Sequence, residues 1–111
     1  MENQLQILQS YLKKFRGVGT YRPLPAVVCR DGFVMSVQVG EGLYCIPRND
    51  VGPWSAVEIG YPSRVEPLLW PYAESPGRWT DTVYPYTPIE VAVAVCELHG
   101  GIDESAAYVS T

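Results

Sequence analysis

Residues 26–39 of the chain, AVVCRDGFVMSVQV, predict a β-hairpin. The first four residues are apolar and mostly β-branched, and the tripeptide RDG that follows is typical of a turn. Because side chains alternate along a strand, the run after the turn should bury one face and leave the other outside the core. The face predicted to be buried carries Phe33, Met35, Val37 and Val39, and the opposite face carries Val34, Ser36 and Gln38.

Three further strands are expected downstream of this hairpin. The runs LYCIP at 43–47 and WSAVEIG at 54–60 have strand composition, and each is bounded by turn residues. Residues 61–81 contain four prolines, which predict a loop with at most one short helical turn near its middle. The run DTVYPYT at 81–87 has strand composition again, and its proline restricts it to a sheet edge or a strand end.

Helices are predicted near both ends of the chain. Residues 2–15 place apolar residues at helical spacing, and the connector 16–25 that follows contains two glycines and two prolines. The motif TPIE predicts that Thr87 caps a second helix over 88–99, which the glycine pair at 100–101 ends. The apolar stripe of the first helix is Leu5, Leu8, Leu12 and Phe15.

The predicted architecture is one domain, 1–111, of the α+β class. A small antiparallel β-sheet, meander-like or Greek-key, forms the β-rich core at 26–87 between an N-terminal and a C-terminal α-helix, and a tail covers 103–111. The content of 47% hydrophobic and 18% charged residues is typical of a folded globular protein. The apolar stripe of the first helix and the connector behind it also predict a homo-oligomer.

Charge and chain termini exclude several classes of partner. Twelve acidic and eight basic residues give a net charge of -4, whereas a general binder of long nucleic acids normally presents a basic face to phosphates. The first residues do not resemble a secretory signal, and no later apolar run reaches membrane-spanning length. We therefore expect a cytoplasmic protein with no membrane partner.

Cysteine and histidine residues offer two candidate chemistries. His99 is the only histidine, so a Cys–His nucleophilic pair must use it, with Cys96 one helical turn away. A zinc site would need Cys29, Cys45, Cys96 and His99, although no C-x-x-C pair is present. The alternative is that the three thiols are reduced and pack in the core while His99 caps a helix. We favour this alternative and expect no catalytic residue, metal or cofactor.

Arginine and tyrosine in loops and at strand ends are the strongest indication of a ligand site. Guanidinium groups bind phosphates in bidentate fashion, and phenol rings stack on nucleobases. The alternative is that the tyrosines brace turns and the arginines pair with acidic residues. The predicted ligand-binding residues are Arg30, Ser36, Gln38, Tyr44, Arg48, Tyr61, Arg64, Tyr84 and Tyr86. Arg30 and Arg48 are the expected phosphate cations, so truncating either should weaken ligand capture.

The strings GFVMSVQVGEGLYCIPRND, VEIGYPS, TVYPYTP and ELHGG resemble those of a family of small phage and prophage proteins over about residues 22 to 102. In function this family is similar to the anti-Thoeris sponges, which are β-rich oligomers that sequester cyclic ADP-ribose signals of bacterial immunity. The resemblance implies an anti-defence protein that binds a cyclic nucleotide, either a cyclic ADP-ribose isomer or a cyclic oligonucleotide, without catalysis. It also implies that the protein acts in the cytoplasm of an infected host cell.

Two other functions remain open at this point. One is a phage inhibitor that occupies the surface of a host defence protein, such as a CRISPR nuclease. The other is an enzyme that degrades the nucleotide signal. Release of unaltered ligand from the heated complex would exclude the enzyme, and failure to bind any nucleotide would favour the inhibitor.

Overall fold

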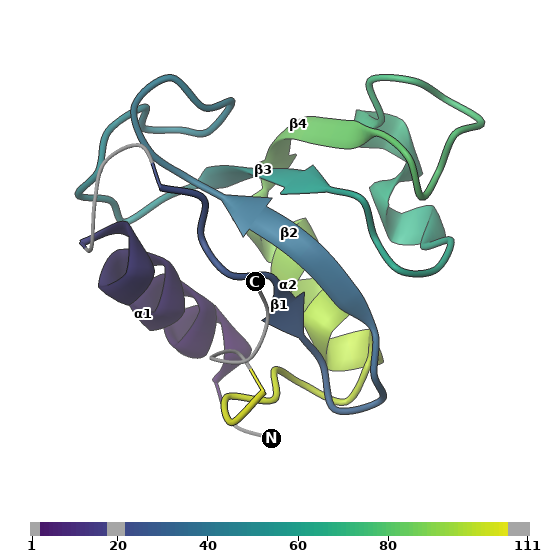
Figure 1. Ribbon diagram of the computed structural model, residues 1–111, viewed down its shortest axis with the longest axis horizontal. Coiled ribbons are helices and arrows are strands. Elements are labelled where there is room, and N and C mark those ends of the chain that lie inside the picture. The colour runs from purple at the N-terminus through teal and green to yellow at the C-terminus, as the bar shows by residue number, and fades with distance from the viewer. Residues whose placement is uncertain (1–2, 18–21, 107–111) are drawn as a thin grey trace.

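The computed structural model describes residues 3–17 and 22–106, which form one antiparallel sheet, two α-helices and a 3₁₀ helix. The strands pair in chain order, β1-β2-β3-β4, so the sheet is a meander (Figure 1). This confirms the α+β class with an N-terminal and a C-terminal helix. The elements are α1 (Gln4–Arg16), β1 (Val27–Val28), β2 (Val34–Gln38), β3 (Ala56–Gly60), η1 (Pro67–Tyr72), β4 (Val83–Pro88) and α2 (Ile89–Leu98).

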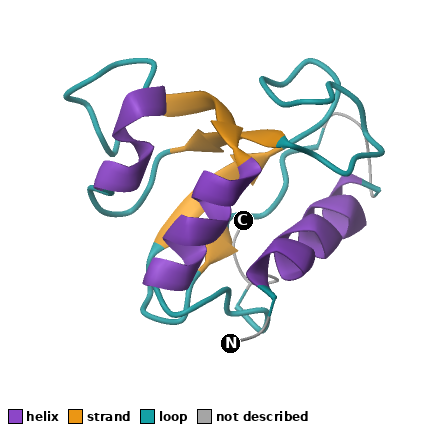
Figure 2. Cartoon of the chain, turned by 180° about the vertical axis from the view of Figure 1, so that it is seen from behind, coloured by secondary structure: helices purple, strands orange, loops and turns teal. Residues whose placement is uncertain are grey.

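The two α-helices lie on one side of the sheet. Helix α2 crosses this side and contacts β3 and β4, and α1 lies beside α2 (Figure 2). The other side of the sheet, which we call the outer face, carries no helix in the described part of the chain. The core between helices and sheet contains Leu8, Leu12, Phe33, Met35, Val37, Ile59, Tyr84, Ala92, Val95 and Cys96.

The hairpin predicted from residues 26–39 is confirmed. Strands β1 and β2 pair antiparallel with Val27 opposite Met35, and the turn between them occupies residues 30–32. Burial alternates along β2 as expected, because the four apolar residues of the predicted core face are all fully buried. Ser36 and Gln38 consequently lie on the outer face, each partly buried.

The strand predicted at 43–47 is wrong. Residues 40–55 form a loop that contains one isolated bridge, between Ile46 and Ala56. Its backbone also bonds to β4, where the Tyr86 N–H donates to Tyr44 O at 3.0 Å, and makes local turn contacts such as Cys45 N to Leu43 O at 2.9 Å. Pro47, which follows the bridge, has no N–H with which to continue a ladder.

Helix α1 packs on its own domain. Leu8 and Leu12 are fully buried, whereas Leu5 at the N-terminal end of the predicted stripe is 41% exposed. Asn3 caps the helix by accepting a hydrogen bond from the Gln6 N–H. The middle of the stripe therefore packs within the chain, and the homo-oligomer stays a prediction.

The start of α2 differs from the prediction, and its end agrees with it. Thr87 does not cap the helix, because it belongs to β4 and its hydroxyl donates to Tyr84 O at 2.9 Å. Pro88 occupies the cap position without a side-chain bond, and Ser55 O accepts the first helical N–H, that of Ile89, at 2.8 Å. At the other end Gly101, with a positive φ of 91°, donates to Cys96 O and closes the helix.

The other predicted elements lie close to their expected places. Strand β3 falls within 54–60, the short helical turn is η1, and β4 is the sheet edge that its proline required. Residues 18–21 of the predicted connector 16–25 and residues 107–111 of the predicted tail 103–111 lie outside the described residues. In residues 3–17 and 22–106 no helix has the length and apolar character needed to cross a bilayer.

Candidate functional site

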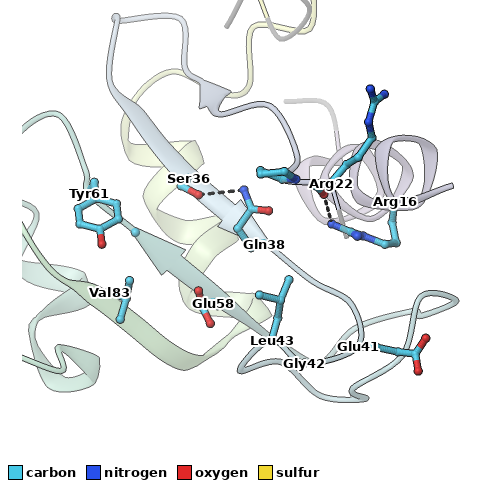
Figure 3. Close-up of a pocket in the computed structure, with 12 residues that line it drawn as sticks. Arg16, Arg22, Ser36, Gln38, Glu41, Gly42, Leu43, Glu58, Tyr61 and Val83 are labelled. Atoms are coloured by element: carbon cyan, nitrogen blue, oxygen red, sulfur yellow. Dashed lines mark hydrogen bonds between the residues drawn. The ribbon is translucent and has the colours of Figure 1, made fainter. Parts of the chain in front are cut away.

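A cavity of about 510 Å³ is open on the outer face of the sheet (Figure 3). Three adjacent strands provide its floor, and the end of α1 and the loops around the sheet provide its walls. Its volume falls in the range of roughly 300 to 1,000 Å³ that is usual for small-molecule sites. The floor residues are Ser36 and Gln38 of β2, Glu58 and Gly60 of β3, and Val83 of β4.

Strand register brings the floor residues together. Ser36 pairs with Gly60 and Gln38 pairs with Glu58, so these side chains stand next to each other on the outer face. Gly60 creates the hollow because it has no side chain. A Cβ atom built there would meet Val83 Cγ1 at 3.6 Å and Ser36 Cβ at 3.7 Å, which are ordinary contacts.

Two polar side chains hold the wall segment that starts at Arg22: Arg16 joins it to α1, and Gln38 joins it to β2 on the floor. The buried Arg16 donates from Nη2 to Arg22 O at 2.7 Å. Gln38 accepts the Leu24 N–H at 2.8 Å and donates from Nε2 to Leu24 O and to Ser36 Oγ, both at 3.0 Å (Figure 3). The segment that starts at Arg22 is therefore held along β2, because the Gln38 side-chain amide bonds to the N–H and C=O of Leu24 as the backbone of a paired strand would.

The Gln38 amide predicts a measurable loss of stability when it is removed. Gln38→Ala leaves the Leu24 N–H and C=O without their partner, and we expect the free energy of unfolding to fall by about 1 to 3 kcal/mol. Urea denaturation measures this change. Ser36→Ala is the matched control, since it removes only one acceptor from the same face, and a loss equal to that of Gln38→Ala would contradict the clamp.

Of the nine ligand-binding residues predicted from the sequence, the structure brings Ser36, Gln38 and Tyr61 to the cavity. Tyr61 lies on the wall at the end of β3 and is 59% exposed. Gln38 has a structural role as well, because its amide nitrogen already has two acceptors.

A second group of predicted residues lies next to the cavity. Tyr44, Arg48 and Tyr86 form a cluster that we call the tyrosine platform, with the two rings 5.6 Å apart and the Arg48 guanidinium 5.7 Å from the Tyr44 ring centre. The Tyr44 N–H donates to Glu58 Oε1 at 3.1 Å. The carboxylate on the cavity floor therefore touches the platform directly.

Three of the predicted residues are not at the cavity. Arg64 pairs with Asp31 at 3.2 Å, and Arg30 donates to Gly100 O at 3.2 Å, both beside the β1–β2 turn. Tyr84 is fully buried and its hydroxyl donates to Trp79 O, so it belongs to the core; burial raises its pKa. Strand alternation explains Tyr84, because it faces the helices.

His99 pairs with two carboxylates. Its Nδ1 lies 2.6 Å from Asp31 Oδ2 and its Nε2 lies 2.8 Å from Glu66 Oε1, and its ring stacks on Phe33 with centres 4.1 Å apart. Burial alone would lower the pKa of His99, but the hydrogen bonds and charges of the two carboxylates outweigh burial and raise it. Both ring nitrogens of His99 therefore contact carboxylate oxygens in this structure.

The three cysteines lie in the core and are fully or almost fully buried. Cys29 and Cys96 form a side-chain hydrogen bond, which lowers the pKa of Cys29 and, together with burial, raises that of Cys96. Burial raises the pKa of Cys45, whose Sγ accepts the Gly40 N–H at 3.3 Å. In residues 3–17 and 22–106 no group of three or more His, Cys, Asp or Glu residues is arranged to hold a metal ion.

Sequence reasoning missed four charged residues of the cavity, namely Arg16, Arg22, Glu41 and Glu58. The sequence prediction placed Arg16 and Arg22 in the connector 16–25 and Glu58 in the strand at 54–60, without assigning any of them to a site. Only the strand register and the helix position bring them together. Figure 3 shows the Arg22 side chain extending away from the sheet, so its guanidinium lies at the rim of the cavity.

Comparison of the chain with protein-family models, with curated proteins and with solved structures found no match in any of the three. The function is therefore inferred from the geometry of the cavity and the residues around it.

Proposed function

We propose that this protein binds a small nucleotide in the outer-face cavity and sequesters it without catalysis. The outer-face cavity is the observation that carries the proposal, because it combines a suitable volume with cationic and anionic groups. A cyclic nucleotide signal of bacterial immunity is the ligand class that the resemblance to anti-Thoeris sponges implies. The protein would then act in the cytoplasm of an infected cell.

The lining suits a ligand that both accepts and donates hydrogen bonds. Arg16 and Arg22 line the cavity with guanidinium groups, a group that binds phosphate; Arg16 is buried and donates to Arg22 O, so Arg22 is the cation we assign to the ligand. Glu58 presents a carboxylate, which accepts hydrogen bonds from ribose hydroxyls and from the amino groups of bases. Tyr61 adds an exposed ring on the wall. A site can bind an anion on a protein of net charge -4 because the local field, and not the total charge, acts on the ligand.

Calorimetric titration with AMP, a cyclic ADP-ribose isomer and cyclic di-AMP tests the proposal. We expect Arg22→Ala to weaken binding by at least about tenfold, since a hydrogen bond to a charged group contributes about 1.5 to 3 kcal/mol. Arg30→Ala is the matched control. Arg30 was a phosphate cation in the sequence-based prediction, but it lies beside the β1–β2 turn, and we now expect its truncation to leave binding unchanged.

A blocking variant tests the location of the site independently of charge. Gly60→Val places a β-branched side chain, which suits a strand, into the floor where its Cβ atom has room. We expect the melting temperature to stay close to that of the parent and nucleotide binding to be lost. Normal binding by Gly60→Val and Arg22→Ala, or no binding of any probe by the parent protein, would overturn the proposal.

Inhibition through a protein surface is the second candidate. The loop and 3₁₀ helix after β3 expose large apolar side chains, which mark protein contacts when they gather on one surface. Absence of nucleotide binding together with capture of a host defence protein would favour this function. The exposed residues are Val65, Leu68, Trp70 and, on α2, Leu98.

A further inference from the structure

The tyrosine platform continues the outer face beyond the cavity. The backbone of Tyr44 is held between β3 and β4, since its N–H donates to the Glu58 side chain at Oε1, 3.1 Å away, and its carbonyl accepts the Tyr86 N–H at 3.0 Å. The two residues of β4 on either side of Pro85 and Tyr86, which are Tyr84 and Thr87, face the core and are fully buried. Tyr86 itself is 42% exposed and Tyr44 is 44% exposed, so the pair presents ring surface to solvent.

Backbone strain is concentrated at the same surface. In the described part of the chain two residues other than glycine have a left-handed φ, Tyr61 at 49° and Tyr86 at 51°. This conformation is unfavourable for a bulky side chain, and such strain gathers at ligand sites. One of these tyrosines lines the cavity and the other belongs to the platform. Tyr86 lies where the pairing of β3 with β4 shifts register, and the irregularity directs its ring outward.

We propose that the platform is a second subsite that stacks a second nucleobase, so the ligand contains two bases joined through phosphates. This inference rests on the proposed function, in which the cavity holds the first nucleotide. Glu58 joins the two subsites, because it lies on the cavity floor and binds the platform backbone. Arg48 and Arg22 place one guanidinium beside each subsite, as a ligand with two phosphates requires. The favoured class is therefore a cyclic dinucleotide and not a single-base cyclic ADP-ribose isomer.

Tyr86→Gly is the sharpest test, because it removes the ring and also relieves the left-handed backbone. We expect it to weaken binding of cyclic di-AMP by roughly tenfold or more, as loss of base stacking does, and to leave AMP binding unchanged. Arg48→Ala should weaken cyclic di-AMP binding in the same selective way. The melting temperature of each variant is measured alongside.

A control outside both subsites separates the ring from the fold. Trp70→Ala removes an exposed aromatic ring that stacks on Trp79 and belongs neither to the cavity lining nor to the platform, so both affinities should stay unchanged.

The possible failures are distinguishable. If the parent binds AMP and cyclic di-AMP equally, or if Tyr86→Gly weakens both probes by the same factor, the platform is not a subsite and the cavity proposal stands. If Tyr86→Gly and Arg48→Ala bind cyclic di-AMP normally, the inference is likewise overturned. If the parent binds neither probe, the proposed function and the inference fail together.

Discussion

Trp54→Ala is expected to lower the free energy of unfolding by about 3 to 5 kcal/mol, the usual cost of truncating a fully buried tryptophan. The side chain is 1% exposed, and it lies in the loop between β2 and β3 where no regular ladder supports the chain. Its indole N–H donates to Asn49 O at 3.1 Å. The Gln9 amide of α1 holds its backbone, donating to Trp54 O at 2.7 Å and accepting its N–H at 3.1 Å. Trp54 therefore joins α1, the loop and the sheet.

Denaturant titration measures this loss, with Val51→Ala as the matched control in the same loop. Val51 is 66% exposed, and its truncation should change stability by no more than about 0.5 kcal/mol. Gly52→Ala adds a second probe, because a Cβ atom at Gly52 would lie 2.7 Å from the Trp54 ring at a φ of +67°. We expect Gly52→Ala to lower the free energy of unfolding less in the Trp54→Ala background than in the parent protein. Equal losses for Trp54→Ala and Val51→Ala would show that the indole does not hold the loop.

Patterns within one element explain why most of the fold could be predicted. Alternation along β2 identified its buried face, and the glycine pair after Leu98 identified the end of α2. Both patterns involve residues that are near in sequence, so they can be recognised without knowing the tertiary structure. The strand predicted at 43–47 was wrong because the loop at 40–55 depends on residues that are distant in the sequence. Its shape is set by contacts over a long separation, such as the amide of Gln9 on the backbone of Trp54.

Strand alternation made the β2 part of the site predictable, and residue type added Tyr61. Ser36 and Gln38 were placed on the outer face because their neighbours are apolar. Glu58 and Arg16 could not be placed, since the register of β3 and the position of α1 decide whether they meet β2. Residue type alone grouped Arg30 and Arg64 with the site, whereas the structure places both beside the β1–β2 turn, outside the cavity lining.

Glu66→Ala is expected to cost about 3 to 5 kcal/mol of unfolding free energy, because it leaves His99 without a buried partner. Glu66 is 3% exposed, and its two oxygens serve different elements. Oε1 lies 2.8 Å from His99 Nε2 at the end of α2, and Oε2 accepts the Leu68 N–H that begins η1 at 3.1 Å. Glu97→Ala is the matched control, since this exposed carboxylate lies on α2 two residues before His99 and should change stability little.

The same cluster makes stability depend on pH in a direction that can be worked out. The pKa of His99 is raised in the folded state, so its contribution is complete below the unfolded value of about 6.5 and is lost as pH rises through the folded value. The pKa of Asp31 is lowered by hydrogen bonds from the Phe33 N–H and from His99, so its contribution is present above about 3.8 and is lost as pH falls.

Proton NMR can separate these groups, because His99 is the only histidine in the chain and its ring protons report a single titration. We expect a pKa above 6.5 in the parent protein and a lower value in Glu66→Gln, which keeps the shape of the side chain and removes one negative charge. Denaturation from pH 6 to 9 should show a smaller loss of stability for Glu66→Gln than for the parent, since less of its stability depends on the charged ring. A parent pKa at or below 6.5 would mean that burial outweighs the two carboxylates, and the cluster would then be a neutral contact and not an ionic one.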